Sequence, residues 1–158
     1  MEERHIEDLL EELRIPYRKS RNDGAWPCVT FAIVTRPGID LELDLELYPD
    51  QVNINFDGCF LMLEQSAFEW RFRSNPKALE EWRTDCLDRI RKIMTSDLRV
   101  ETRVRQDGTP IGGFLYRWDR QQWESCGGGG SMLMFLGVKK VSEYRSWQAC
   151  DGQPTEQS

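Results

Sequence analysis

Acidic side chains occupy every second position from residue 40 to residue 46, a pattern that could attract cations or a basic molecule. They are Asp40, Glu42, Asp44 and Glu46, and one leucine separates each from the next. Alternate residues of a β-strand share a face at intervals of about 6.6–6.8 Å, so the four carboxylates would form a line about 20 Å long. This acidic row is the strongest candidate for a functional surface in the sequence.

Three interpretations of the acidic row remain open. In the first, it is the solvated face of a half-buried strand, and cross-strand ion pairs worth about 0.2–1 kcal/mol each balance its charge. The sequence offers five arginines for those pairs: Arg71, Arg73, Arg99, Arg103 and Arg105. In the second, the row is an interaction surface for a basic protein, with mimicry of nucleic-acid phosphates as a special case. In the third, it binds a divalent metal, although carboxylates spread along one strand do not converge on a single ion.

Few other residues have the types and spacing that catalysis needs. His5 is the only histidine, which excludes HExxH and any Ser-His-Asp or Cys-His arrangement that does not use His5. Carboxylates alone can perform acid–base chemistry, but the spacing singles out no pair. The segment CGGGGS at 126–131 lacks the lysine of a P-loop and the GxGxxG spacing of a dinucleotide site. We therefore predict no catalytic residue, no cofactor and no metal.

Residues 119–131 are predicted to form a surface loop, because four consecutive glycines restrain the backbone little. Trp123 stands in this polar segment, where no periodicity requires burial. It is either an exposed anchor for a protein interface, since tryptophan is enriched among binding hot spots, or it folds back onto the edge of the domain. Trp70 and Trp82 occupy apolar positions of periodic segments and are predicted to lie in the core.

The charge of the chain is distributed unevenly. The 158 residues carry a net charge of −6, with 39% hydrophobic and 30% charged residues, as in a globular protein. The first 50 residues contain 12 acidic and 6 basic side chains, whereas the remainder contains 15 of each. An acidic N-terminal third disfavours binding to nucleic acid or to an anionic membrane. It suits a basic protein partner, or solubility alone.

The cysteines and the N-terminus indicate a cytoplasmic protein. Five widely spaced cysteines include no CxxC pair, so they are predicted to be buried thiols rather than metal ligands or a disulfide framework. The charged N-terminus, MEERHIEDLL, lacks the apolar run of a secretory signal. No apolar stretch approaches the length that crosses a bilayer.

The N-terminal half of the chain predicts one helix followed by a meander of strands. Apolar residues at helical spacing indicate an amphipathic helix over residues 2–14, which Pro16 ends. The segment RKSRNDG is predicted to be a polar connection. Strands are then predicted at 29–34, 39–48, 52–56, 59–64 and 68–72. The segments 39–48, 52–56 and 68–72 alternate with a period of two residues, whereas 59–64 is a more continuously apolar run.

The C-terminal half contains the strongest helix signal. Asn75 is a suitable N-cap and Pro76 a suitable first residue for a helix over 76–94, whose apolar residues recur at steps of three and four. A strand over 98–104, a turn at QDGTP and a strand over 111–118 follow. Beyond the predicted loop we expect a strand at 132–138 and a short helix at 141–147.

These elements predict an α+β fold. A single domain over residues 1–148 would contain an antiparallel meander of about five to seven strands, packed against one long helix and a short N-terminal helix. Residues 149–158 are predicted to be a flexible tail.

In this general character, small, acidic, α+β and poor in catalytic residue types, the chain resembles the immunity proteins with which bacteria neutralise their own toxins. The resemblance implies a non-catalytic protein that binds and inhibits a protein partner with a basic surface, and we expect the acidic row and Trp123 to contact that partner. Two alternatives remain open. One is a small enzyme or ligand-binding protein with a carboxylate or cysteine beside residues 119–131, and the other is a homodimer that pairs through sheet edges or exposed strand faces.

Overall fold

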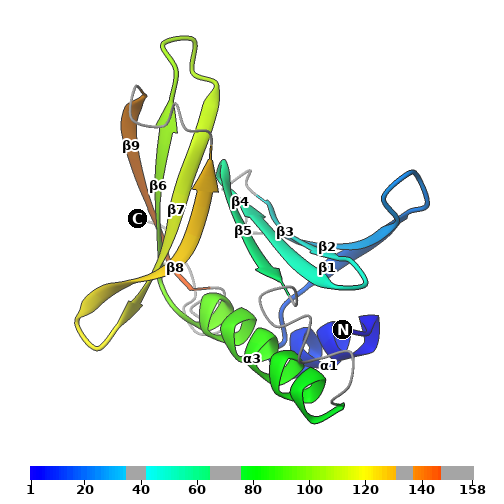
Figure 1. Ribbon diagram of the computed structural model, residues 1–158. Helices are drawn as coiled ribbons and strands as arrows, with labels where there is room; N and C mark the ends of the chain where they lie inside the picture. The colour runs from blue at the N-terminus through cyan, green and yellow to red at the C-terminus, as the bar shows by residue number, and fades with distance from the viewer. Residues whose placement is uncertain (35–41, 65–75, 131–136, 147–158) are drawn as a thin grey trace, which may run out of the picture.

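The structure is a computed structural model that describes residues 1–34, 42–64, 76–130 and 137–146. Over these ranges it contains two helices and nine strands, and the strands form two antiparallel sheets (Figure 1). The predicted α+β class is confirmed. The strands divide between two sheets, however, where the sequence indicated a single meander.

Sheet A contains the first five strands, and each is hydrogen-bonded to its neighbour in the chain. They are β1 (Tyr17–Asn22), β2 (Cys28–Val34), β3 (Glu42–Leu47), β4 (Gln51–Phe56) and β5 (Cys59–Glu64). In β3, Leu43, Leu45 and Leu47 are buried, and the acidic residues between them point to the opposite face. The two-residue period of the strand therefore determines which face of sheet A joins the core.

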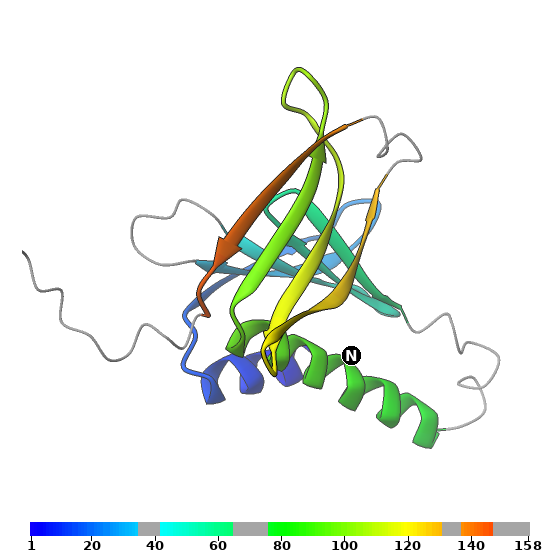
Figure 2. The same cartoon turned by 90° about the vertical axis from the view of Figure 1, so that its left-hand side faces the viewer.

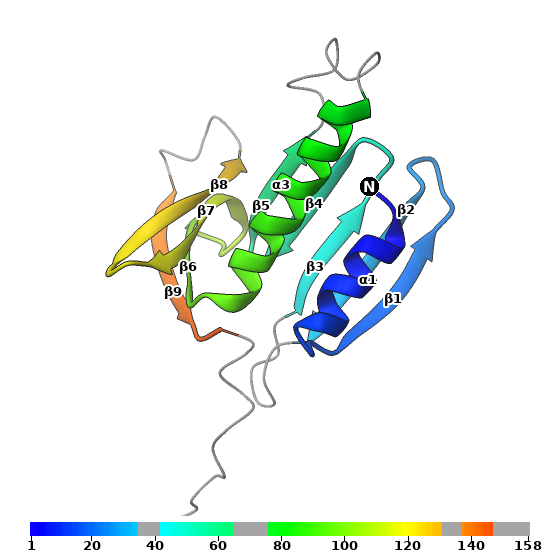
Figure 3. The ribbon, with the colours of Figure 1, turned by 90° about the horizontal axis from the view of Figure 1, so that it is seen from below.

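Two helices cover the apolar face of sheet A, α1 (Glu3–Glu12) and α3 (Pro76–Thr95), as Figure 3 shows from below. Their buried residues recur at steps of three and four: Ile6, Leu9 and Leu10 in α1, and Trp82, Cys86, Ile90, Ile93 and Met94 in α3. Arg91 on α3 donates hydrogen bonds of 2.6 and 2.7 Å to the Glu12 carboxylate. Both predicted helices are confirmed. Neither of these described helices is long and apolar enough to cross a membrane.

Sheet B stands beside β5 and contains the other four strands in the order β8-β7-β6-β9. They are β6 (Leu98–Val104), β7 (Pro110–Asp119), β8 (Gln122–Gly130) and β9 (Val138–Tyr144). In Figure 2 these strands cross in front of those of sheet A. Leu98, Val100 and Leu115 join the buried cluster that also contains residues of sheet A and both helices. A common core thus connects the two sheets.

Three segments differ from the prediction made from sequence. The segment 18–24, predicted as a polar connection, contributes most of β1; the predicted loop at 119–131 contains β8; and the predicted helix at 141–147 overlaps β9. All of β1 after Tyr17 is exposed, so no apolar alternation marks the strand. The glycines of β8 likewise give no periodic signal, because they have no side chains to bury or expose.

Several predictions lie outside the described residues. They concern Asp40, the core position of Trp70, the N-cap Asn75, the strand at 68–72 and the tail at 149–158. Most of the strand expected at 132–138 lies there too, although its last residue, Val138, begins β9.

Candidate functional site

The face of sheet A opposite the helices has no described element over it, and we call it the open face (Figure 1). The alternation of β3 directs Glu42, Asp44 and Glu46 onto this face. Three of the four residues of the predicted acidic row therefore share one surface.

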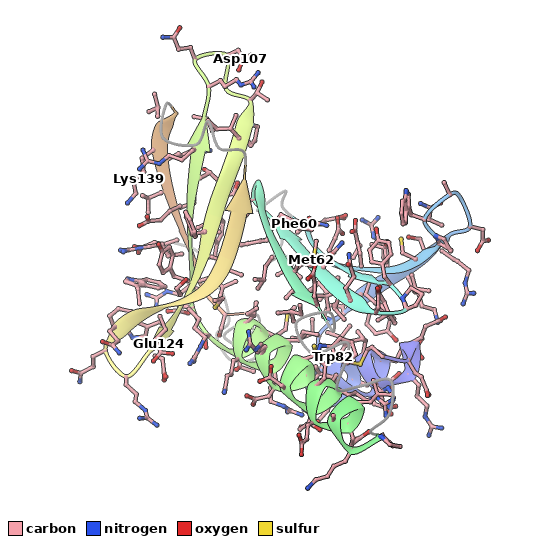
Figure 4. All side chains as sticks on the ribbon, in the orientation of Figure 1. Phe60, Met62, Trp82, Asp107, Glu124 and Lys139 are labelled. Carbon is pink, nitrogen blue, oxygen red and sulfur yellow. The ribbon has the colours of Figure 1, made fainter. Side chains whose placement is uncertain are left out.

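Strands β4 and β5 extend the open face beyond the carboxylates. Two rows of side chains cross β3, β4 and β5, and the strand registers give them as Asp44–Asn55–Phe60 and Glu46–Asn53–Met62. Phe60 and Met62 are 37% and 38% exposed, and Figure 4 labels both on the side of β5 away from α3. The open face thus passes from carboxylates through amides to two apolar side chains. None of Asn53, Asn55, Phe60 and Met62 was predicted as a site residue, although the alternation of QVNINF places both asparagines on one face.

A hollow of about 290 Å³ lies on the open face beside the turn at Asp57. Its lining residues include Glu42, Asp44, Asn55 and Phe60, so carboxylates, an amide and an aromatic ring belong to the residues around it. Carboxylate oxygens and aromatic rings are the groups that bind a lysine ammonium or an arginine guanidinium. The hollow therefore has the chemistry of a receptor for a basic side chain.

Asp44 differs from Glu42 and Glu46, which both have a described partner. Burial, followed by the charges of Glu42 and Glu46, raises its pKa, and Arg18 acts in the opposite direction. Arg18 itself reaches from β1 to form an ion pair with Glu42. No residue within the described ranges forms an ion pair or hydrogen bond with the Asp44 carboxylate. Among the described residues, repulsion between the three acids is thus only partly balanced, and a nearby cation would stabilise the ionised form of Asp44.

Hydrogen bonds from neutral side chains orient Glu46. The Tyr48 hydroxyl and the Asn53 amide each donate to its Oε2 atom at 3.3 Å, and Gln51 donates to Asn53 at 3.1 Å. Burial, together with contacts to Cys28 and Glu46, raises the pKa of Tyr48 to about 12, so the phenol remains a donor at neutral pH. These contacts hold the carboxylate in place and leave its negative charge on the open face.

Three of the five arginines predicted to balance the acidic row lie in the other sheet. They are on β6 or directly after it, in sheet B, which is not a neighbour of β3: Arg99, Arg103 and Arg105. This part of the prediction is wrong because the strands divide between two sheets. The other two, at positions 71 and 73, fall outside the described residues. Arg18 was missed because β1 was not recognised as a strand.

Trp123 lies on β8 in sheet B, so the structure does not bring it together with the acidic row. Its ring meets that of Trp118 edge-on at 5.1 Å between centroids, and the Arg99 guanidinium lies 4.6 Å from its centroid. These three residues and Glu143 line a hollow of about 500 Å³ on sheet B. Trp118 is the more exposed of the two indoles, at 44%, and sequence reasoning did not select it. The predicted loop position of Trp123 is wrong, and the residue packs against its own sheet.

A third hollow, of about 320 Å³, lies between α3 and sheet B and contains Cys126. Burial raises the pKa of Cys126 to about 11. At neutral pH only about one in ten thousand such thiols would be ionised, and the thiolate is the reactive form. Burial therefore disfavours the reactive thiolate form of Cys126.

His5 lies in the first turn of α1, as predicted, and its Nδ1 atom accepts a hydrogen bond of 3.2 Å from the backbone of Glu2. It helps to cap the helix. Throughout the described part of the chain, no three His, Cys, Asp or Glu side chains come together in a group that could hold a metal ion.

No protein-family model matches the chain, and no match is found among curated proteins or solved structures. The open face is therefore interpreted from its geometry and charge alone.

Proposed function

We propose that the protein is a non-catalytic binding protein whose open face recognises a basic surface on a protein partner. The observation that carries this proposal is the hollow lined by Glu42, Asp44, Asn55 and Phe60. Its two carboxylates supply charge, its amide supplies a hydrogen-bond acceptor, and its ring supplies an apolar wall. A lysine or arginine from the partner would satisfy all three.

Electrostatic complementarity explains why such a partner would be favoured. The pKa of Asp44 is raised, first by burial and then by the adjacent Glu42 and Glu46, so a nearby cation would stabilise its ionised form. The exposed edges of Phe60 and Met62 add apolar area next to the charges. Complementary charge would raise the association rate and favour basic partners over others. The apolar area would lower the dissociation rate.

The most concrete form of this function is an immunity-type protein that inhibits a toxin by covering its basic surface. The competing hypothesis is an enzyme or ligand-binding site that uses a carboxylate or a cysteine beside residues 119–131, and the raised pKa of Cys126 argues against its cysteine form. A Cys126→Ser variant should therefore retain full partner binding and full inhibition.

The decisive experiment compares two matched triple variants in affinity capture from lysate of the source organism. Glu42→Gln, Asp44→Asn and Glu46→Gln together neutralise the open face. Glu80→Gln, Glu81→Gln and Asp85→Asn remove the same charge from the exposed side of α3. A partner identified by mass spectrometry with the unmodified protein should be lost with the first variant and kept with the second.

The purified complex then provides the quantitative measurement. We expect the open-face variant to weaken affinity by about tenfold or more at low salt, and the salt dependence of binding to decrease. If the partner is a toxin, co-expression with the same variant should protect cells less well. Equal affinity of both triple variants and the unmodified protein would contradict the proposal.

A further inference from the structure

Among the described strands, β9 lies at an edge of sheet B. It pairs with β6 on one side, and Figures 1 and 2 show no described strand on its other side. The opposite edge of the sheet, β8, lies against β5, where Gly127 faces the Leu61 side chain. On β9, Val138 and Val141 are 63% and 47% exposed. An open edge of this kind presents unpaired backbone donors and acceptors to another strand.

The sequence of β9 is complementary to itself in the antiparallel direction. If two copies of VKKVSEY pair with Val141 opposite Val141, then Lys139 of each copy lies opposite Glu143 of the other. Val138 then lies opposite Tyr144, and no two like charges face each other. Antiparallel pairing about a twofold axis through the Val141 pair produces each of the other contacts twice.

The charges within one protomer support this register. Lys139, labelled in Figure 4, forms an ion pair of 2.7 Å with Glu101, and Glu143 forms one of 2.6 Å with Arg99. These residues lie on one face of the sheet, because Lys139, Val141 and Glu143 alternate along β9. Contact between Lys139 and Glu143 across the axis would join the two intramolecular pairs into one network of alternating charge.

We propose that two copies of this chain associate through β9, antiparallel and centred on Val141, so that their four-stranded sheets form one continuous sheet. The occupant of the β9 edge is therefore the same strand of a second copy. This inference does not depend on the proposed function, since the open face belongs to sheet A. The interface consists of one strand from each copy, so the association should be reversible and dependent on concentration.

The test is sedimentation velocity over a range of protein concentrations with Lys139→Glu, Glu143→Lys and an equimolar mixture of the two. Each single variant places like charges opposite each other twice, and we expect its dimer dissociation constant to rise by at least about tenfold. In the Lys139→Glu variant, positions 139 and 143 are both acidic, and in the Glu143→Lys variant both are basic. A dimer of one copy of each variant therefore places opposite charges together at both 139/143 contacts. We expect this mixed dimer to form. Lys140→Glu is the control, because residue 140 would lie opposite Ser142 and meet no charge.

Circular dichroism of each variant establishes that it is folded before association is measured. If the charge reversals disturb folding, Val141→Lys provides an independent route. It brings two ammonium groups together at the axis and leaves the Lys139 and Glu143 positions intact, so it should abolish dimers. The proposal is overturned if the unmodified protein is monomeric at every concentration, if a folded single variant associates as well as the unmodified protein, or if the mixture of folded variants does not associate.

Discussion

At the scale of single residues, Asp44 shows how a cluster of acidic side chains on one face of a sheet can oppose stability. Its carboxylate is half-buried between two other acids, and its pKa is raised for that reason, by burial first and by Glu42 and Glu46 next. The protonated form is thus the one that the folded state favours. Because the pKa of Asp44 is raised, the folded state binds its proton more tightly than the unfolded state does. This proton binding stabilises the fold below pH 3.8, the ordinary pKa, and the stabilisation is lost as the pH rises through the folded-state pKa.

We therefore predict that Asp44→Asn stabilises the protein at neutral pH. The amide removes the repulsion, and the gain should be about 0.2–1 kcal/mol, the scale of charge interactions across a sheet. It should disappear below about pH 3, where Asp44 is protonated in both states. Urea unfolding at neutral and acidic pH measures both effects.

Asp23→Asn is the matched control, because Asp23 is exposed in the turn between β1 and β2. It should leave the unfolding free energy nearly unchanged at both pH values. An Asp44→Asn protein that is less stable than the unmodified protein at neutral pH would show that the carboxylate is compensated in solution.

At the scale of elements, the glycines of β8 allow this strand to approach β7 closely. A Cβ atom at Gly128 would lie 2.2 Å from the carbonyl oxygen of Gly113 and 2.7 Å from the Cα atom of Phe114. At Gly129 the nearest atom would be the Phe60 carbonyl oxygen at 3.9 Å, an ordinary contact. Adjacent glycines therefore have different roles, and only one of them is required by the packing.

This difference predicts opposite outcomes for two alanine substitutions. Gly128→Ala should destabilise the protein by about 1–3 kcal/mol or more, because the backbone of β7 or β8 must move to accept the methyl group. Gly129→Ala should change stability by less than about 0.5 kcal/mol. Thermal unfolding of both variants gives the comparison, and equal effects would contradict the close approach of β7 and β8.

The same elements show what could be predicted from sequence. Alternation identified β3 and β4, and helical spacing with Pro76 identified α3, because in each case the periodic side chains form the core. Strand β8 was not predicted because its glycines alternate in no property that the sequence displays. The close approach of the β7 backbone requires glycine at position 128, and this requirement produces no pattern of polar and apolar residues. In β9, Val141 and Tyr144 are three residues apart, a spacing that fits a helix as well as a strand.

The candidate site was predicted only in part for a related reason. The direction of Glu42, Asp44 and Glu46 follows from local alternation. The hollow around Asp44 depends on which strands lie next to β3 and in which register, and a single sequence does not specify those pairings. Phe60 lies in the site because β5 pairs with β4. Arg18 reaches Glu42 from β1, a strand that was not predicted from the sequence.

At the scale of the whole molecule, Tyr144 connects the two sheets. Its ring meets that of Phe56 in sheet A edge-on at 4.9 Å between centroids, and its hydroxyl donates a hydrogen bond of 2.5 Å to Asp57. Burial, followed by this contact with Asp57, raises the pKa of Tyr144 to about 12. The polar contact adds to the apolar core at the junction between sheets A and B.

Removal of this hydroxyl tests its contribution to stability. Tyr144→Phe keeps the ring and should cost about 1–2 kcal/mol, as expected for a partly exposed hydrogen bond to a carboxylate. The contribution is fully present below pH 10 and is lost as the pH rises towards 12, so the two proteins should converge in stability over that interval. Urea unfolding across this pH range provides the measurement.

Tyr116→Phe in the same sheet is the control, since no hydrogen bond involves its hydroxyl among the described residues. Its effect should be close to zero at every pH. A Tyr144→Phe protein as stable as this control would mean that water replaces the contact with Asp57 at no cost.

The strand order of sheet A also bears on how the chain acquires its structure during synthesis. Every pairing in this sheet joins consecutive strands, so each hairpin closes a short loop at low entropic cost. By contrast, β9 must return past β7 and β8 to reach β6. Low contact order favours rapid folding, and domains assemble from the N-terminus as the ribosome releases them. In pulsed hydrogen exchange we expect amides of β2–β4 to gain protection before those of β9. The open face of sheet A, with its carboxylates, would then form on the nascent chain before β9 pairs with β6.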